Sequence, residues 1–189
     1  MLMGHLAVGL ALKARFKRAP LLPLLLAVQL LDWIWLILVW LGQEQFHLKP
    51  ESIFLQYDFS NAVYSHSLFW SIFYAIVTFL LFIGASGQRH WAAPLSLGVL
   101  SHWPLDWLLH DHDLPFANFG PDLAFGLGVQ TLSEPAAFLL ETLLLAVGWM
   151  IYYRSVRRDG PRQNRCAWGI LATLLLLNVC LYAFPLLLG

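Results

Sequence analysis

Long apolar stretches alternate with short polar segments along the whole chain. Five stretches approach the roughly 20 apolar residues that a helix needs to cross the hydrocarbon core of a bilayer. They are Leu21–Leu41, Tyr64–Ser86, Ala92–His110, Glu134–Tyr153 and Ala167–Leu188. The first twelve residues are also apolar but too few to span alone, so we expect a half-membrane helix or a helix packed inside the bundle. The pattern predicts an all-α fold, a polytopic membrane helical bundle with about five transmembrane helices plus a short N-terminal helix. No repeat or linker interrupts it, so residues 1–189 should form a single integral-membrane domain.

The composition excludes several other classes of protein. Hydrophobic residues make up 59% of the chain and charged residues only 12%, about half the charged share of a soluble domain. A soluble domain of this size could not hide so much apolar surface, and a disordered chain would be polar. The formal net charge is zero, which argues against nucleic-acid binding through a basic face.

Charge is distributed unevenly between the segments that connect the predicted spans. Ten of the eleven basic residues lie in 13–18, at Arg89 and in 154–165. The opposite loops, 42–63 and 111–133, hold one basic residue, Lys49, and six acids: Glu44, Glu51, Asp58, Asp111, Asp113 and Asp122. Because basic loops stay on the cytoplasmic side of a membrane, we expect the basic segments inside the cell and the acidic loops outside.

Asp32, His102, Asp106 and Glu141 are ionisable residues that lie well inside the predicted spans. A charged group at the centre of a bilayer costs roughly 2.5–3.5 kcal/mol, so such groups need a partner, water or a metal. For any one of them, a hydrogen-bonded group that fixes helix packing is the simpler interpretation. Their spacing and depth, taken together, favour a site.

The spacing places ligand-type side chains on one helix face. His102, Asp106 and His110 follow one another at intervals of four residues, which stacks them one turn apart in a helix. Pro104 should bend this helix or free a carbonyl. Imidazole nitrogen and carboxylate oxygen together suit zinc or a similar divalent ion.

The predicted depths agree as well. With a rise of about 1.5 Å per residue, Asp32, His102, Asp106 and Glu141 lie roughly 6–14 Å below the outer ends of their spans. His66 and His110 fall at the outer boundary, and His5, counted from its basic anchor, reaches a level near that of Asp32. We therefore expect residues from several segments to converge in the outer half of the membrane.

These residues stand in a recognisable set of short motifs. The motifs are Gly4-His5-Leu6, Leu30-Leu31-Asp32-Trp33, Tyr64-Ser65-His66-Ser67-Leu68 and Ser101-His102-Trp103-Pro104-Leu105-Asp106. Over about residues 1–113, and more weakly around Glu141, the chain resembles the YdjM-type membrane-bound metal-dependent hydrolases, a bacterial family. That family is thought to be related to zinc-dependent phospholipase C and the P1-type nucleases, all-helical enzymes that cleave phosphate esters with clustered zinc ions.

The resemblance implies a set of metal ligands. Asp32, His66, His102 and Asp106 would form one metal site. His5 would bind a second ion with Asp106 as the bridge, and a further site would use His110 and Glu141. Relatives often carry Pro-Asp-x-Asp in the first span, whereas this chain supplies only Asp32 there, so the number of ions stays between one and three.

The resulting functional hypothesis is a metal-dependent hydrolase of the bacterial inner membrane, with its site facing the outer side. Its substrate would be a phosphate ester of a lipid or a lipid-linked molecule, with Asp32 or Glu141 as the base that takes a proton from water. Two alternatives stay open: an ion- or proton-handling transporter, and a non-catalytic membrane scaffold with a structural metal. The sequence does not define an oligomeric state.

Overall fold

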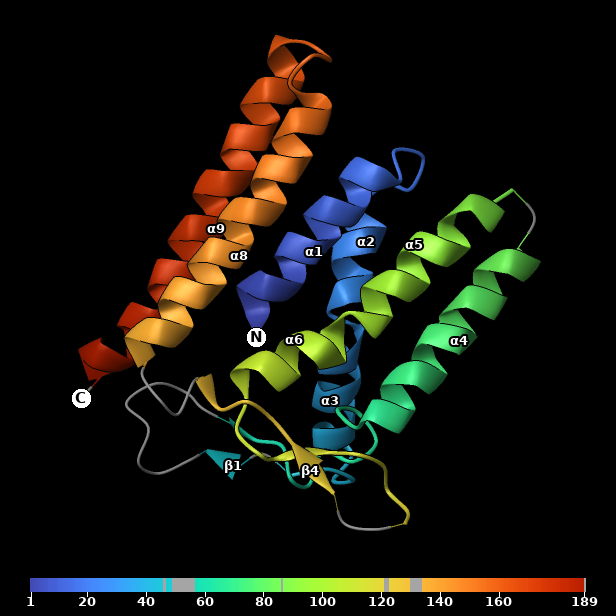
Figure 1. The fold of residues 1–189 in the computed structure, drawn as a ribbon, viewed down its shortest axis with the longest axis vertical. Helices are drawn as coiled ribbons and strands as arrows, with labels where there is room; N and C mark the ends of the chain where they lie inside the picture. The colour runs from blue at the N-terminus through green and yellow to red at the C-terminus, as the bar shows by residue number, and fades with distance from the viewer. Residues whose placement is uncertain (46, 49–56, 86, 121–122, 130–133, 189) are drawn as a thin grey trace.

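The computed structural model describes residues 1–45, 47–48, 57–85, 87–120, 123–129 and 134–188, which are mainly helical (Figure 1). The helices are α1 (Leu2–Arg15), α2 (Leu21–Val28), α3 (Leu30–Trp40), α4 (Leu68–Gly84), α5 (Arg89–Leu100), α6 (His102–Leu109), α8 (Glu134–Val156) and α9 (Pro161–Leu188). Two antiparallel pairs of two-residue strands lie in the segments between helices. β1 (His47–Leu48) pairs with β2 (Tyr57–Asp58), and β3 (Leu114–Pro115) pairs with β4 (Ala124–Phe125). Ser86, Lys49, Glu51 and Asp122, which entered the predictions of spans and loops, lie outside the described residues.

Two of the predicted spans have the length and composition of membrane-crossing helices. In the described part of the chain these are Pro135–Val156 within α8 and Pro161–Ala183 within α9. The first predicted span is a broken pair, because α2 and α3 meet at an angle of 54°. The second corresponds to α4, an apolar helix of 17 residues. Helix length alone therefore supports two spans, or three if the bent pair is one span.

The predicted span over residues 92–110 is divided into α5 and α6 at Ser101. Pro104 lacks the N–H group that would bond to the carbonyl of Leu100 in a continuous helix. The Ser101 hydroxyl donates a 2.7 Å hydrogen bond to the carbonyl of Gly98. Pro104 was expected to bend a single helix; the structure instead has two helices, and α6 turns away from the axis of α5 (Figure 1).

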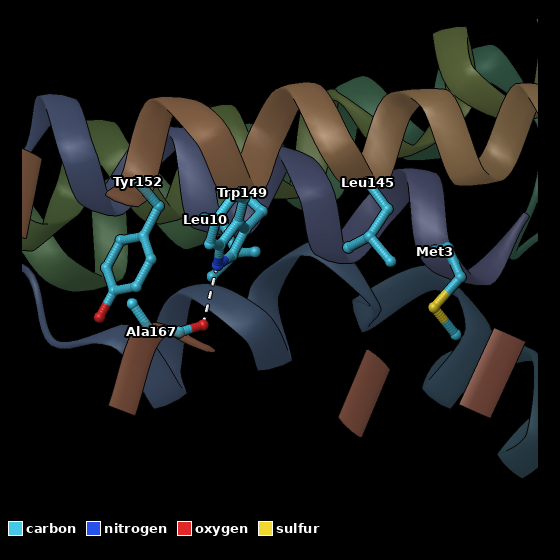
Figure 2. Packing of buried hydrophobic residues seen from close by; sticks show 6 residues of the cluster. All are labelled: Met3, Leu10, Leu145, Trp149, Tyr152 and Ala167. Carbon is cyan, nitrogen blue, oxygen red and sulfur yellow. Dashed lines mark hydrogen bonds between the residues drawn. The ribbon is translucent and has the colours of Figure 1, made fainter. Parts of the chain in front are cut away.

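The N-terminal helix α1 lies inside the bundle, packed lengthwise against α8 and also against α2 (Figure 1). Figure 2 shows the main apolar cluster along this contact, which consists of Met3, Leu10, Leu145, Trp149, Tyr152 and Ala167. The indole N–H of Trp149 donates a 2.8 Å hydrogen bond to the carbonyl of Ala167 and ties α8 to α9. Burial of these side chains holds α1 in a fixed position.

The two ends of the bundle differ in structure. The turns that follow α1, α4 and α8 lie at the upper end in Figure 1, and these carry the basic residues of segments 13–18, 89 and 154–165. The short strands lie at the opposite end (Figure 1). The Ser67 hydroxyl, which accepts a 3.3 Å hydrogen bond from the N–H of Trp70, caps the start of α4 at that end.

Candidate metal centre

Five of the predicted site residues meet at one place between the helices. His5 comes from α1, Asp32 from the first turn of α3, His66 from the segment before α4, and His102 and Asp106 from α6. The side chains of four are at most 2% exposed, whereas that of Asp32 is 33% exposed. The cluster is therefore buried among helices and opens at Asp32.

Two overlapping groups in this cluster have the geometry of metal ligands. One consists of His5, Asp32 and His102, and the other of His66, His102 and Asp106. Within each group, one ligand atom per residue lies within 4.8 Å of the others. Because His102 is common to both groups, the five residues form one continuous centre.

Four distances around His66 and His102 are close to those between neighbouring ligands of one metal ion, although Asp32 and Asp106 fall in different ligand groups. Asp32 Oδ1 lies 3.3 Å from His66 Nε2 and 3.6 Å from His102 Nε2. Asp106 Oδ2 lies 3.0 Å from His102 Nε2 and 3.9 Å from His66 Nε2. Ligand atoms about 2.1 Å from a tetrahedral zinc ion are separated by about 3.4 Å. These four distances bracket that value.

The other oxygen of Asp106 faces a different set of groups. Asp106 Oδ1 lies 3.1 Å from His5 Nε2 and 3.0 Å from the amine of Met1. The rings of His5 and His102 are stacked, with centroids 3.7 Å apart and an interplanar angle of 11°. The Asp106 carboxylate thus faces His5 with one oxygen and His66 and His102 with the other.

Two buried nitrogens in the cluster have no hydrogen-bond partner among the described residues. They are Nδ1 of His5 and Nε2 of His102. The His102 nitrogen is 3.0 Å from Asp106 Oδ2 without forming a hydrogen bond to it. An unsatisfied buried polar atom costs about 1–3 kcal/mol, and a cation bound between His102 Nε2 and the two aspartates would remove that cost at His102. The residues present therefore fit a divalent metal such as zinc.

The break between α2 and α3 also orients a ligand. At this break the carbonyl of Val28 accepts a 2.7 Å hydrogen bond from Nδ1 of His102. A carbonyl only accepts, so Nδ1 carries a proton and Nε2 is the nitrogen that faces the two aspartates. A hydrogen bond from the second ring nitrogen to a backbone carbonyl is the usual way in which metal-binding histidines are held.

Two predicted site residues lie outside both ligand groups. The expected row of His102, Asp106 and His110 ends early, because α6 stops at Leu109 and His110 adopts extended backbone angles. His110 Nε2 is 4.0 Å from Asp106 Oδ1, and its Nδ1 is 3.9 Å from Asp113 Oδ1. His110 thus lies at the edge of the centre, between Asp106 and Asp113.

Glu141, on α8, lies against the first turn of α1. Its Oε2 accepts a 2.6 Å hydrogen bond from the backbone N–H of Met3, and its Oε1 accepts one of 3.3 Å from the Tyr182 hydroxyl. The carboxylate therefore satisfies an N–H group in the first turn of α1, where a negative charge also interacts favourably with the helix dipole. This contact positions the helix that carries His5.

One buried acid near the centre has no counterpart among the predicted site residues. Glu44 is 2% exposed and contacts Tyr64 and Ser65, directly before His66. Its separation of 21 residues from Ser65 gives no local pattern in the sequence. The motif around His66 singled out Ser65, but only the folded chain reveals the acid.

Comparisons with known proteins add nothing to this geometry. A scan against family models, a search of curated proteins and a search of solved structures each returned no match.

Proposed function

We propose that this chain is a membrane-embedded metal-dependent hydrolase that cleaves a phosphate ester of a lipid or lipid-linked substrate near the outer leaflet. The observation that carries the proposal is the buried convergence of three histidines and two aspartates from four separate segments. The five-span arrangement, with basic turns in the cytoplasm of a bacterial cell and the centre towards the outer side, belongs to the same proposal.

In this proposal Asp32, His66, His102 and Asp106 hold one divalent ion, and His5 holds a second that shares Asp106. A bound divalent ion lowers the pKa of a coordinated water and neutralises phosphoryl oxygens. The chain itself fixes the ligands, excludes bulk water through burial, and supplies Asp32 as the proton acceptor. Asp32 suits this role because it is the cluster carboxylate with an exposed surface. His110 and Glu141 complete the proposed set at its margins.

The packing between the centre and the basic turns favours a closed site over a transport path. In α1 beyond His5, and throughout α2 and α5, the buried residues are apolar: Ala7, Gly9, Leu10, Leu24, Val28, Ala92, Pro94, Leu95, Gly98 and Val99. A transporter needs polar groups or water along its path through the membrane. Among these three helices, the polar groups on this side are Gln29 at the end of α2 and Ser96 in α5, whose hydroxyl bonds to the Ala75 carbonyl, and they do not form a continuous row towards the basic turns.

The surroundings of Asp32 favour an amphiphilic substrate. Trp33 is 50% exposed and Leu36, one helical turn after Asp32, is 48% exposed. The exposed apolar surface beside Asp32 suits the acyl chain of a lipid. The Asp32 carboxylate would then lie near the lipid headgroup. A lipid phosphate can therefore approach from the membrane, without passing through the loops.

Metal content and turnover test the proposal together. The protein is purified in detergent, metal per chain is measured, and release from phosphodiesters, phosphomonoesters and a panel of lipid phosphates is assayed for wild type and Asp106→Ala. We expect bound metal and turnover in wild type, with both lost in the variant. A wild type without divalent metal, or a variant with unchanged metal content, contradicts the metal site. Bound metal with no turnover on the whole panel contradicts the hydrolase and favours a scaffold or a transporter.

A further inference from the structure

The carboxylate of Glu44 is fully engaged by the segment that carries His66. Its Oε1 accepts hydrogen bonds from the backbone N–H groups of Tyr64, at 2.7 Å, and Ser65, at 3.0 Å. Its Oε2 accepts one of 2.6 Å from the Ser65 hydroxyl. Glu44 lies beyond the end of α3, which carries Asp32, so these bonds join two segments that both supply ligands.

The chain of hydrogen bonds continues to the ring of His66 and has a defined direction. A carboxylate only accepts, and a serine hydroxyl has one hydrogen to donate. Since the Ser65 hydrogen points to Glu44, Ser65 Oγ can only accept from His66 Nδ1, which lies 2.8 Å away. The proton of a neutral His66 is therefore on Nδ1, and the lone pair is on Nε2.

That lone pair faces other acceptors. His66 Nε2 is 3.3 Å from Asp32 Oδ1 and 3.9 Å from Asp106 Oδ2. A bare nitrogen and two carboxylate oxygens repel one another unless a cation lies between them. The bond from His102 Nδ1 to the Val28 carbonyl produces the same tautomer in the neighbouring ring. Both histidines thus present Nε2 to one point.

We propose that Glu44 is a positioning residue: acting through Ser65, it holds the His66 proton on Nδ1 and so presents Nε2 to a divalent cation. This inference rests on the proposed metal site, and it adds a buried acid outside the ligand groups to the residues that determine metal affinity. Groups that orient a metal-binding histidine in this way change affinity by about 10–100-fold when they are lost.

Glu44→Gln reverses the direction of the hydrogen bonds without changing the size of the side chain. The amide oxygen keeps the two backbone N–H bonds, so the amide NH₂ faces Ser65 and donates to its oxygen. The Ser65 hydrogen then turns to His66 Nδ1 and drives the ring proton to Nε2, which is the wrong nitrogen for the metal. We expect zinc affinity about 10–100-fold below wild type.

Ser65→Ala and the double variant separate this effect from a general loss of structure. Ser65→Ala leaves His66 Nδ1 without a directed partner, so the tautomers interconvert and affinity falls by less than in Glu44→Gln. Adding Ser65→Ala to Glu44→Gln removes the misdirected donor, so the double variant should bind zinc more tightly than Glu44→Gln alone. Asp111→Asn is the control for loss of one charge: the Asp111 side chain is 47% exposed and belongs to neither ligand group, so this variant should bind zinc as wild type does.

Zinc affinity is measured in detergent by competition with a chelating dye. A double variant that binds as weakly as Glu44→Gln or more weakly overturns the proposal, as does a Glu44→Gln variant with wild-type affinity. The proton position on His66 is read independently from ¹⁵N chemical shifts of the metal-free protein at a pH where the ring is neutral. Nδ1–H in wild type and Nε2–H in Glu44→Gln support the positioning role, and the same tautomer in both overturns it. Because this second measurement needs no metal, it still decides the role of Glu44 if the wild type binds no cation and the proposed function fails.

Discussion

Gly148 on α8 packs directly against the backbone of the helix that carries His5. A Cβ atom at this position would lie 2.7 Å from the carbonyl carbon of Ala7 and 2.8 Å from its Cα, and it would also meet the Ala7 carbonyl oxygen. Ordinary contacts of this kind begin at 3.4 Å. All three atoms belong to the backbone of α1, so no side-chain rotation can relieve the clash. Gly148→Ala must therefore displace the helix by about 0.7 Å or more, the difference between 2.7 and 3.4 Å.

A displacement of this size matters for the metal centre. Ligand distances in metal sites tolerate about 0.2 Å, and His5 lies two residues from Ala7 on the same rigid helix. Overpacking costs about 1–3 kcal/mol, of which the helical preference of alanine over glycine returns up to about 1 kcal/mol. We expect Gly148→Ala to lower the free energy of unfolding by up to about 2.5 kcal/mol and to weaken or abolish metal binding at the group that contains His5.

Thermal unfolding in detergent and metal content per chain test both expectations. Gly169→Ala on α9 is the matched control, because a Cβ there would meet no described atom within 4 Å. The control should keep its full metal content and gain up to about 1 kcal/mol from helix propensity. If Gly148→Ala retains wild-type stability and full metal content, the reasoning that couples the α1–α8 contact to the centre is refuted.

Three further predictions address single contacts. Glu141→Leu leaves the N–H of Met3 without its acceptor, so the unfolding free energy should fall by about 1–3 kcal/mol; an unchanged unfolding midpoint would contradict this. His102→Ala should abolish metal binding, whereas His112→Ala should keep it, because the His112 side chain is 75% exposed; equal metal content in the two variants would refute the assignment. Trp149→Phe removes the hydrogen bond to α9 but keeps most of the packing, so calorimetry should show a loss of about 0.5–1.5 kcal/mol; a larger loss would mean that packing dominates.

The sequence predicted what depends on local periodicity. A spacing of four residues placed His102 and Asp106 on one helix face, and their ligand atoms lie 3.0 Å apart. Depth estimates from helical rise placed His5, Asp32 and His66 in the same half of the predicted bundle, and the structure brings their side chains together.

Periodicity carries no information where side-chain direction or a chain break decides the arrangement. Rise fixes the height of a residue but not which side of a helix it faces, and Glu141 at a similar depth turns to the backbone of Met3. His110 continued the spacing in sequence, but the helix ends before it. Glu44 was interpreted as an outer-loop acid, because nothing in its neighbourhood reveals the distant serine that it binds. Long-range hydrogen bonds leave no periodic signal, so this part of the centre required the structure.

The contact between His5 and Asp106 joins residues that are 101 positions apart. Ribosomes add roughly 5–20 residues per second, so α6 is synthesised about 5–20 s after α1. Throughout that interval the imidazole of His5 has to be accommodated without the carboxylate that later balances it. The centre therefore cannot assemble before α6 has been made, and until then His5 lacks its contact with Asp106.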